Sequence, residues 1–297
     1  MLNDVETDQN VNRRYYQALA DYYVRYVREY ERQGIHIDYV SPFNEPGGYT
    51  KITISDIRDF IRDYLGPTFE REHLTTRIQL SEAGGRTDAA RNYPVVLDDP
   101  AARKYVSVLP YHGYDWAGWD DIAELRSNYP DIPLWMTELC CKHGQDVAPE
   151  FQSGDVWANC IFSDLEAGAS AWIYWNAILD ESGGPWLTSP IHNDADGNAQ
   201  NSVVVIDRQK HTVAYTGLYY YLAHFSKFVR PGATRVGTSA SAPEGVRGIS
   251  FQNSDGTLVT ELLNSGDAEV DARVDWHGQS VALKLPATSI TTLQWRP

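Results

Sequence analysis

The chain has 297 residues, of which 42% are hydrophobic and 12% aromatic, enough to build the core of one or two domains. Its 25 Lys and Arg against 40 Asp and Glu give a net charge of −15, which argues against a nucleic-acid partner. No apolar run approaches the ~20 residues of a transmembrane helix, so we expect no membrane span. The acidic start, MLNDVETDQN, lacks the pattern of a signal peptide, and we expect a soluble protein of undetermined compartment.

Helical and β-rich segments alternate over the first 230 residues. Apolar residues three and four positions apart, or a capping residue, predict helices at 11–33, 55–71, 95–103, 118–128, 153–167 and 213–226. Mostly apolar β-rich segments are expected near 36–43, 76–85, 104–114, 133–141 and 170–177. Strands that are separated by helices favour a parallel sheet. Polar residues stand at the carboxyl ends of these strands, where (β/α) barrels carry their active sites. We therefore predict an incomplete (β/α) barrel of the TIM type with about five strands.

The rhythm of the sequence changes at about Val236. Short segments with alternating apolar residues, among them TLVTELLN and VALKL, are separated by turn signals such as Ser-Asp-Gly and His-Gly. This pattern is typical of a small antiparallel β-sandwich. We expect a catalytic barrel domain at residues 1–230 and a β-sandwich domain at residues 231–297.

Two carboxylates stand at strand ends of the predicted barrel. Glu45 lies in the sequence Asn-Glu-Pro, and Glu138 follows Trp-Met-Thr. Each alone is more often a solvated cap or an ion-pair partner. The ends of parallel strands in a barrel meet in one cleft, so the two side chains can face each other there. A pair of facing carboxylates can hydrolyse a glycoside, with one acting as the acid and the other as the nucleophile.

Longer motifs surround these carboxylates, namely YVSPFNEP (39–46), YHGY (111–114), MTELCC (136–141), GASAWIYWNAILDESGGPW (168–186) and AYTGLYYYLAHFSKFVRPGATRVG (214–237). The chain resembles the glucosylceramidase family, glycoside hydrolase family thirty, from about residue 13 onward. The Asn-Glu-Pro motif is shared by many retaining barrel glycosidases, whereas the last two segments are much more specific to this family.

The resemblance implies a role for several residues. Glu45 would be the general acid/base and Glu138 the nucleophile, and Asn44 would bind the sugar 2-hydroxyl. The other residues expected to bind substrate would line the cleft, with the Trp ring as a floor under the sugar: His112, Tyr114, Trp175 and Asn176. For Trp175, packing inside the barrel is the competing interpretation. No cofactor and no metal are implied.

Two departures from the family pattern carry expectations of their own. Gly113 replaces an aromatic residue and should widen the cleft. Five strands are expected where the family barrel has eight, which leaves two open edges and apolar side chains such as Val40, Val108 and Ile173 uncovered. We therefore expect a homodimer that covers the open side of the barrel, with the Tyr-rich first helix of one copy serving as wall for the other.

Other candidate sites are weaker. Glu82 also stands at a strand end, but a structural role is favoured because neither catalytic role is vacant. The segment 194–198 imitates the beginning of a calcium loop but lacks the later ligands, and a surface turn explains it better. The expected function is that of a retaining, exo-acting β-glycosidase resembling a β-glucosidase, with β-xylosidase or β-fucosidase specificity close behind. The alternative is a carbohydrate-binding fragment of such an enzyme with weak or no turnover.

Overall fold

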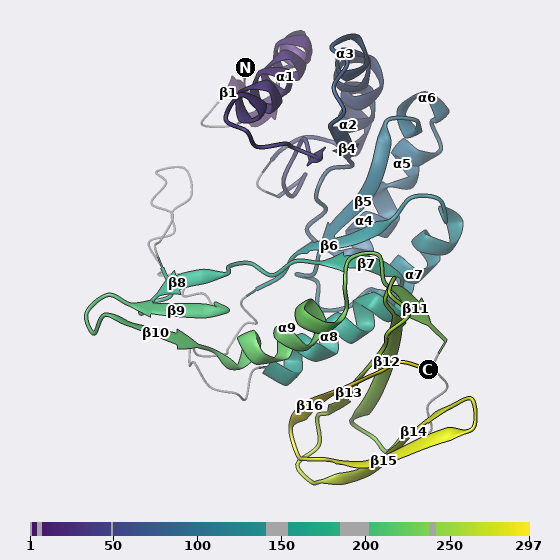
Figure 1. Cartoon of the computed structure of the whole chain (residues 1–297). Coiled ribbons are helices and arrows are strands. Elements are labelled where there is room, and N and C mark those ends of the chain that lie inside the picture. Colours follow the sequence, from purple (N-terminus) through teal and green to yellow (C-terminus); the bar gives the residue numbers. More distant parts are fainter. Residues whose placement is uncertain (1, 5–7, 49, 141–153, 185–201, 238–241) are drawn as a thin grey trace. The chain divides into compact units, whose positions relative to one another are not determined.

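The computed structural model describes residues 2–4, 8–48, 50–140, 154–184, 202–237 and 242–297 (Figure 1). The chain divides into two compact units, residues 1–139 with 167–174 and residues 140–166 with 175–297. These units differ from the predicted domains at 1–230 and 231–297, which were inferred from the change of sequence pattern. The predicted domain boundary therefore stays a prediction. None of the helices in the described ranges is long and apolar enough to cross a bilayer.

The first unit contains one parallel sheet in the strand order β3-β4-β5-β6-β7. Its strands are β3 (Tyr39–Val40), β4 (Arg77–Gln79), β5 (Val106–His112), β6 (Leu134–Glu138) and β7 (Ala169–Trp172). Each strand pairs with its sequence neighbour, as expected when helices connect parallel strands. This sheet confirms the predicted incomplete barrel of five strands.

Helices occupy the segments between the strands (Figure 1). They are α1 (Tyr16–Arg32), α2 (Ile54–Phe60), α3 (Gly66–Arg71), α4 (Arg86–Asn92), α5 (Pro94–Leu97), α6 (Pro100–Arg103) and α7 (Trp119–Asn128). A π-helical turn, Ile61–Leu65, joins α2 to α3, so the helix predicted at 55–71 is continuous. Helix α4 was not predicted, because its only buried residues are Arg86 and Ala89 and it has no apolar period.

Helix α1 buries a face that is made mostly of small apolar side chains. The buried residues are Tyr16, Ala20, Val24 and Val27. Three of the tyrosines are exposed instead, with 58% of Tyr22, 40% of Tyr26 and 38% of Tyr30 accessible. Small side chains let a helix approach its neighbours closely, whereas Tyr hydroxyls gain by remaining in water. The result is an exposed stripe of tyrosines at positions four residues apart.

Two of the three apolar side chains expected to be uncovered are in fact buried. Val40 is 7% exposed and Val108 is fully buried, whereas Ile173 is 49% exposed. Val108 lies in β5, which is flanked by β4 and β6, so its surroundings do not depend on further strands. The apolar surface left open in the first unit is therefore smaller than the strand count alone predicts.

The second unit contains the β-sandwich. One sheet has the order β11-β12-β13-β16, and the other pairs β14 with β15. The strands are β11 (Thr234–Val236), β12 (Val246–Gln252), β13 (Leu258–Asn264), β14 (Val270–Trp276), β15 (Gln279–Leu285) and β16 (Ser289–Trp295). All pairs are antiparallel, which confirms the predicted antiparallel module.

The second unit also has two helices and a small sheet that was not predicted. The helices are α8 (Gly154–Glu166) and α9 (Gly217–Phe228), and the sheet joins β8 (Ile178–Asp180), β9 (Val204–Asp207) and β10 (Thr212–Tyr215). The helix predicted at 213–226 therefore begins later, because Thr216 caps it and the residues before it pair with β9. Near the start of the chain, β1 (Leu2–Asp4) pairs with β2 (Asp8–Val11).

A buried carboxylate lies inside the sandwich. Glu261 in β13 is fully buried, and one of its oxygens accepts a hydrogen bond of 2.6 Å from the Thr292 hydroxyl. The Thr292 oxygen in turn lies 2.6 Å from His224 Nδ1 on α9. Among the described residues, the second Glu261 oxygen has no hydrogen-bond partner. Burial therefore raises the pKa of Glu261 to about 8.

This carboxylate makes the stability of the protein depend on pH. The folded chain keeps the Glu261 proton up to pH 8, whereas the unfolded chain loses it near 4.5, so stability falls as the pH rises between these values. We expect Glu261→Gln to increase the free energy of unfolding by about 3 kcal/mol at pH 8.5 and by little at pH 4.5. Urea unfolding at both pH values measures this. The exposed Glu269→Gln is the matched control, and equal stability of both variants at pH 8.5 would contradict the expectation.

Candidate active site

Glu45 lies in a tight turn that follows β3. Its backbone has φ +43°, in the left-handed region that non-glycine residues rarely adopt. Two hydrogen bonds hold this conformation: the Glu45 N–H donates to the Glu82 carbonyl at 2.8 Å, and the Gly48 N–H donates to the Glu45 carbonyl at 3.0 Å. Such conformations persist where the surrounding structure fixes them, and they concentrate at functional sites.

Strands β5 and β6 bring His112 and Glu138 together. Both residues are the last of their strands, and they are partners in the parallel pairing of the two strands. The Gly113 N–H donates a 2.9 Å hydrogen bond to the Glu138 carbonyl, which continues the pairing past the strand end. The site therefore stands at the carboxyl edge of the sheet, as predicted.

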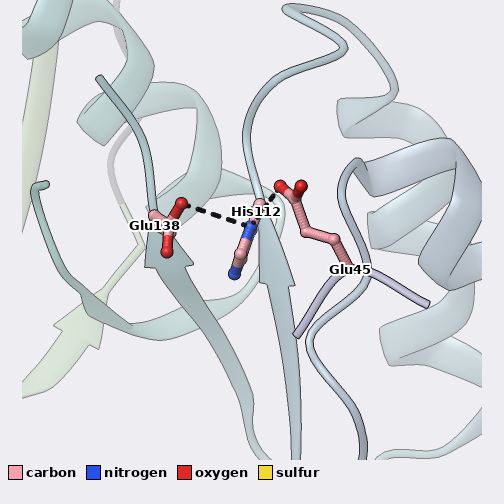
Figure 2. Close-up of side chains that lie close together, drawn as sticks. All are labelled: Glu45, His112 and Glu138. Carbon is pink, nitrogen blue, oxygen red and sulfur yellow. Dashed lines mark hydrogen bonds and ion pairs between the residues drawn. The ribbon is translucent and has the colours of Figure 1, made fainter. Parts of the chain in front are cut away.

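His112 lies between the two carboxylates (Figure 2). Its Nδ1 is 2.8 Å from Glu45 Oε1 and 3.7 Å from Glu138 Oε1. The nearest ligand atoms of these three side chains all lie within 4.8 Å of one another. Only 1% of the His112 side chain is exposed, against 15% for Glu45 and 21% for Glu138, so both carboxylates can be reached from the solvent side.

Tyr114 binds the second carboxylate. Its hydroxyl donates a 2.9 Å hydrogen bond to Glu138 Oε1. Burial and the neighbouring Glu138 raise the pKa of Tyr114 far above its usual value, so the hydroxyl keeps its proton and remains a donor. The structure thus places four of the predicted site residues in one group: Glu45, His112, Tyr114 and Glu138.

Opposing effects act on the ionisation of Glu138. Burial raises its pKa above the usual value, and the negative charge of Glu45 adds to this. His112 and the hydrogen bond from Tyr114 act in the other direction. A carboxylate must be ionised to attack an electrophile, so the acidic limb of a pH–activity profile should report Glu138.

The bond from Tyr114 can be tested through this acidic limb. We expect Tyr114→Phe to raise the pKa of Glu138, because a hydrogen bond that stabilises its charged form is lost. The acidic limb of kcat/KM should then move upward by about one pH unit, with kcat about tenfold lower. Glycosidase rates between pH 3 and 8 measure this. Tyr105→Phe is the control: it removes a hydroxyl that donates a hydrogen bond to the surface carboxylate of Glu70, and it should leave the acidic limb unchanged. If the acidic limb of Tyr114→Phe stays at the wild-type pH, the limb does not report the ionisation of Glu138.

Comparison with known proteins identifies the family. The model of the glycosyl hydrolase family 30 TIM-barrel domain matches residues 6–229, and that of the family 30 β-sandwich domain matches residues 232–293. The chain belongs to glycosyl hydrolase family 30. This confirms the resemblance seen in the sequence motifs.

Several family 30 relatives are similar over most of this chain. The putative glucosylceramidase 4 of Caenorhabditis elegans is 30% identical over 86% of this chain and 51% of its own length. The endo-1,6-beta-D-glucanase neg1 of Aspergillus fumigatus is 26% identical over 94% of this chain and 56% of its own. The crystal structure of SrfJ from Salmonella typhimurium has a TM-score of 0.88 at 25% identity, over 99% of this chain and 66% of that one. The chain spans about half the length of the curated relatives it matches.

Three other predicted site residues of this family 30 chain are not placed in the same group. Asn44 is exposed directly beside Glu45. Trp175 is 46% exposed, which argues against a role in core packing, and the Asn176 carbonyl accepts a hydrogen bond from Val203. Trp175 and Asn176 belong to the second unit, so their place beside the carboxylates stays a prediction. The imitated calcium loop at 194–198 lies outside the described residues.

Gly113 has a different role from the one expected. A Cβ at this position would lie 2.9 Å from a Leu139 methyl carbon and 3.0 Å from an Arg86 nitrogen. The position therefore points into packed protein, and its lack of a side chain allows close packing rather than a wider cleft. Arg86 also donates a 3.1 Å hydrogen bond to the Gly113 carbonyl and pairs with Asp115 at 3.0 Å. Arg86 thus supports the loop that carries Tyr114, and no motif in the sequence predicts this.

A metal or a cofactor is not needed to explain the grouping. Two carboxylates and an imidazole within 4.8 Å are groups that bind divalent cations. The 2.8 Å contact between His112 and Glu45 is, however, a direct hydrogen bond, and it is shorter than the separation of two ligands on one zinc ion. The arrangement suits proton transfer between side chains and substrate, and we assign no metal to it.

Proposed function

We propose that this chain is a retaining β-glycosidase that acts by double displacement. The observation that supports it most directly is the approach of the Glu45 and Glu138 oxygens to within 4.8 Å of each other. Retaining glycosidases hold their carboxyl groups about 5–5.5 Å apart, whereas inverting ones need about 6.5–9.5 Å to admit a water molecule. An approach of two carboxylate oxygens to within 4.8 Å supports the shorter of these two spacings, and so the retaining mechanism.

In the proposed reaction the two carboxyl groups have opposite tasks. Glu45 gives its proton to the glycosidic oxygen as the bond from this oxygen to the anomeric carbon breaks, and a Glu138 oxygen forms a new bond to that carbon. Glu45 then takes a proton from water, whose oxygen attacks the anomeric carbon and releases Glu138. The Tyr114 hydroxyl holds the attacking carboxylate in place, and Asn44 binds the 2-hydroxyl.

For the substrate we propose a terminal β-glucoside, with a β-xyloside or β-fucoside as close alternatives. The name of the similar worm protein, a putative glucosylceramidase, supports an enzyme that removes one glucose unit. The name of the Aspergillus relative, an endo-1,6-beta-D-glucanase, favours cleavage within a chain. The exposed ring of Trp175 offers an apolar face for a pyranose in either case.

A panel of substrates tests the proposal. Aryl β-glucosides, β-xylosides and β-fucosides should be hydrolysed with the first sugar product in the β-configuration, as followed by proton NMR. A β-1,6-glucan oligosaccharide separates the two modes, because exo-action releases glucose only and endo-action releases shorter oligosaccharides. Release of the α-anomer first would overturn the retaining mechanism.

The second candidate is a carbohydrate-binding chain with weak or no turnover. The five-stranded sheet favours it, because the described residues supply only part of a barrel wall around the sugar. Calorimetric titration with a β-glucoside, beside the hydrolysis assay, separates the two candidates. Binding without product over days would favour the second.

We also propose that two copies associate through the tyrosine stripe of α1 and the open side of the sheet. The exposed tyrosines at 22, 26 and 30 and the exposed Ile173 support an apolar contact. Light scattering at micromolar concentration should give about twice the 33.5 kDa of one chain. Charged replacements, Tyr22→Glu with Tyr26→Glu, should lower both the mass and the activity, and a stable wild-type monomer would refute this proposal.

A further inference from the structure

A third carboxylate contacts the group formed by Glu45, His112 and Glu138. Glu82 follows β4, and its side chain is 15% exposed. One of its oxygens accepts a hydrogen bond from the Thr137 hydroxyl and lies 3.8 Å from His112 Nε2. The two-carboxylate mechanism gives this residue no task, although its burial is costly for a charged group.

The imidazole of His112 faces carboxylates at both of its nitrogens. Nδ1 is turned toward Glu45 and Glu138, and Nε2 is turned toward Glu82. The ring is almost fully buried, so water contributes little to its protonation. The group that faces one ring nitrogen influences whether the other nitrogen carries a proton. The charge of Glu82 therefore affects the hydrogen bond between His112 and Glu45.

Glu82 is also connected to the backbone on either side of the site. Its carbonyl accepts the hydrogen bond from the Glu45 N–H that holds the left-handed turn. Its carboxylate accepts from Thr137, the residue before Glu138, whose hydroxyl also lies 3.3 Å from the Tyr111 carbonyl. One residue thus touches the turn of the acid/base, the strand end of the nucleophile and the histidine between them.

We propose that Glu82 is a positioning residue that acts through His112: its carboxylate fixes the orientation and protonation of the imidazole, and thereby the sharing of protons between Glu45 and Glu138. This role rests on the proposed glycosidase function but requires no contact between Glu82 and the sugar. It is an alternative to the purely structural role that the sequence favours for this residue.

Several neighbouring groups act on the ionisation of Glu82. Burial raises its pKa, and the negative charge of Glu138 adds to this, whereas the hydrogen bonds from Thr137 and Ser41 and the charge of His112 lower it. If Glu82 only filled space, a neutral glutamine of the same shape would serve equally well or better.

The isosteric variant Glu82→Gln tests the proposal. Loss of the negative charge weakens the positive character of His112, which is one of the influences that lower the pKa of Glu138. The same change also removes a negative charge that repels Glu138, so the two effects oppose each other. We expect the acidic limb of kcat/KM to move by about one pH unit, with the direction showing which effect is larger. On an activated aryl β-glucoside, kcat should fall about 10- to 100-fold with KM changed less than about threefold, as for a group that acts in proton transfer. Glu124→Gln, an equal change of charge on the exposed side of α7, should change neither.

A second measurement does not depend on activity. The 15N shifts of the His112 ring, followed with pH, should differ between Glu82→Gln and the wild type, because the carboxylate charge that faces Nε2 is lost. Ring titration and pH limbs that match the wild type in a folded Glu82→Gln protein would overturn the proposal. If the wild type lacks glycosidase activity, the proposed function fails, while the ring titration still decides the role of Glu82.

A variant that keeps the charge guards against a folding defect. Glu82→Asp withdraws the carboxylate from His112 by one methylene and should move the ring titration and the acidic limb in the same direction but less. Thermal unfolding of each variant measures folding separately. A loss of activity in Glu82→Asp that follows thermal stability, with the ring titration unmoved, would show a structural role only and would also overturn the proposal.

Discussion

Replacing Glu138 by alanine is expected to lower kcat for β-glucosides by about 10⁴-fold or more, because the variant lacks the group that forms the covalent bond to the sugar. The fold should remain, since Glu138 is the last residue of β6 and 21% of its side chain is exposed. The alanine also leaves a space beside Tyr114 where a small anion can enter.

Rescue by azide tests whether the lost group is the nucleophile. With an activated aryl β-glucoside, azide should attack from the side that Glu138 vacates and yield an α-glucosyl azide, which NMR identifies. Glu138→Gln is the companion variant, because it fills the space and should show no rescue. Wild-type activity in either variant, or formation of the β-azide by Glu138→Ala, would show that Glu138 is not the nucleophile.

Replacing Glu45 by alanine should give losses that depend on the leaving group. A dinitrophenolate leaves without a proton, so bond cleavage in dinitrophenyl β-glucoside should be nearly as fast as in the wild type. An alkyl glucoside needs the proton, and its kcat/KM should fall by about 10³- to 10⁴-fold, within the range found for general acid catalysis. The position of Glu45, 2.8 Å from His112 and 15% exposed, lets its carboxyl reach a bound substrate.

The dinitrophenyl and alkyl glucosides serve as controls for each other, because they differ in whether the leaving group needs a proton. Hydrolysis of the sugar from Glu138 should still be slow in Glu45→Ala, so azide should speed turnover of the dinitrophenyl substrate and yield the β-glucosyl azide. The opposite configuration from the Glu138→Ala product would establish the two roles together. Equal losses on both substrates would show that Glu45 is not the acid.

Much of the fold follows from local sequence patterns. The alternation in TLVTELLN and VALKL predicts strands that correspond to β13 and β15 within a few residues. The succession of apolar strands and amphipathic helices predicts a parallel sheet, because parallel neighbours need a crossover connection and a helix is the usual one. Glu45 and Glu138 could be selected as a pair for the same reason, since the ends of such strands meet at one edge.

Only the tertiary structure decided how the remaining groups meet. Glu82 and Thr137 are 55 residues apart, and Glu45 and His112 are 67 apart, so no local pattern records that they touch. The exposed tyrosines of α1 show the same limit, because the buried face of a helix is selected by the neighbours against which it packs. The sequence by itself determined most of the helices and strands and which strand ends carry carboxylates, whereas α4 and the small sheet β8-β9-β10 have no clear local pattern. Only contacts between distant segments place the buried His112 between these carboxylates, with Glu45 at one ring nitrogen and Glu82 at the other.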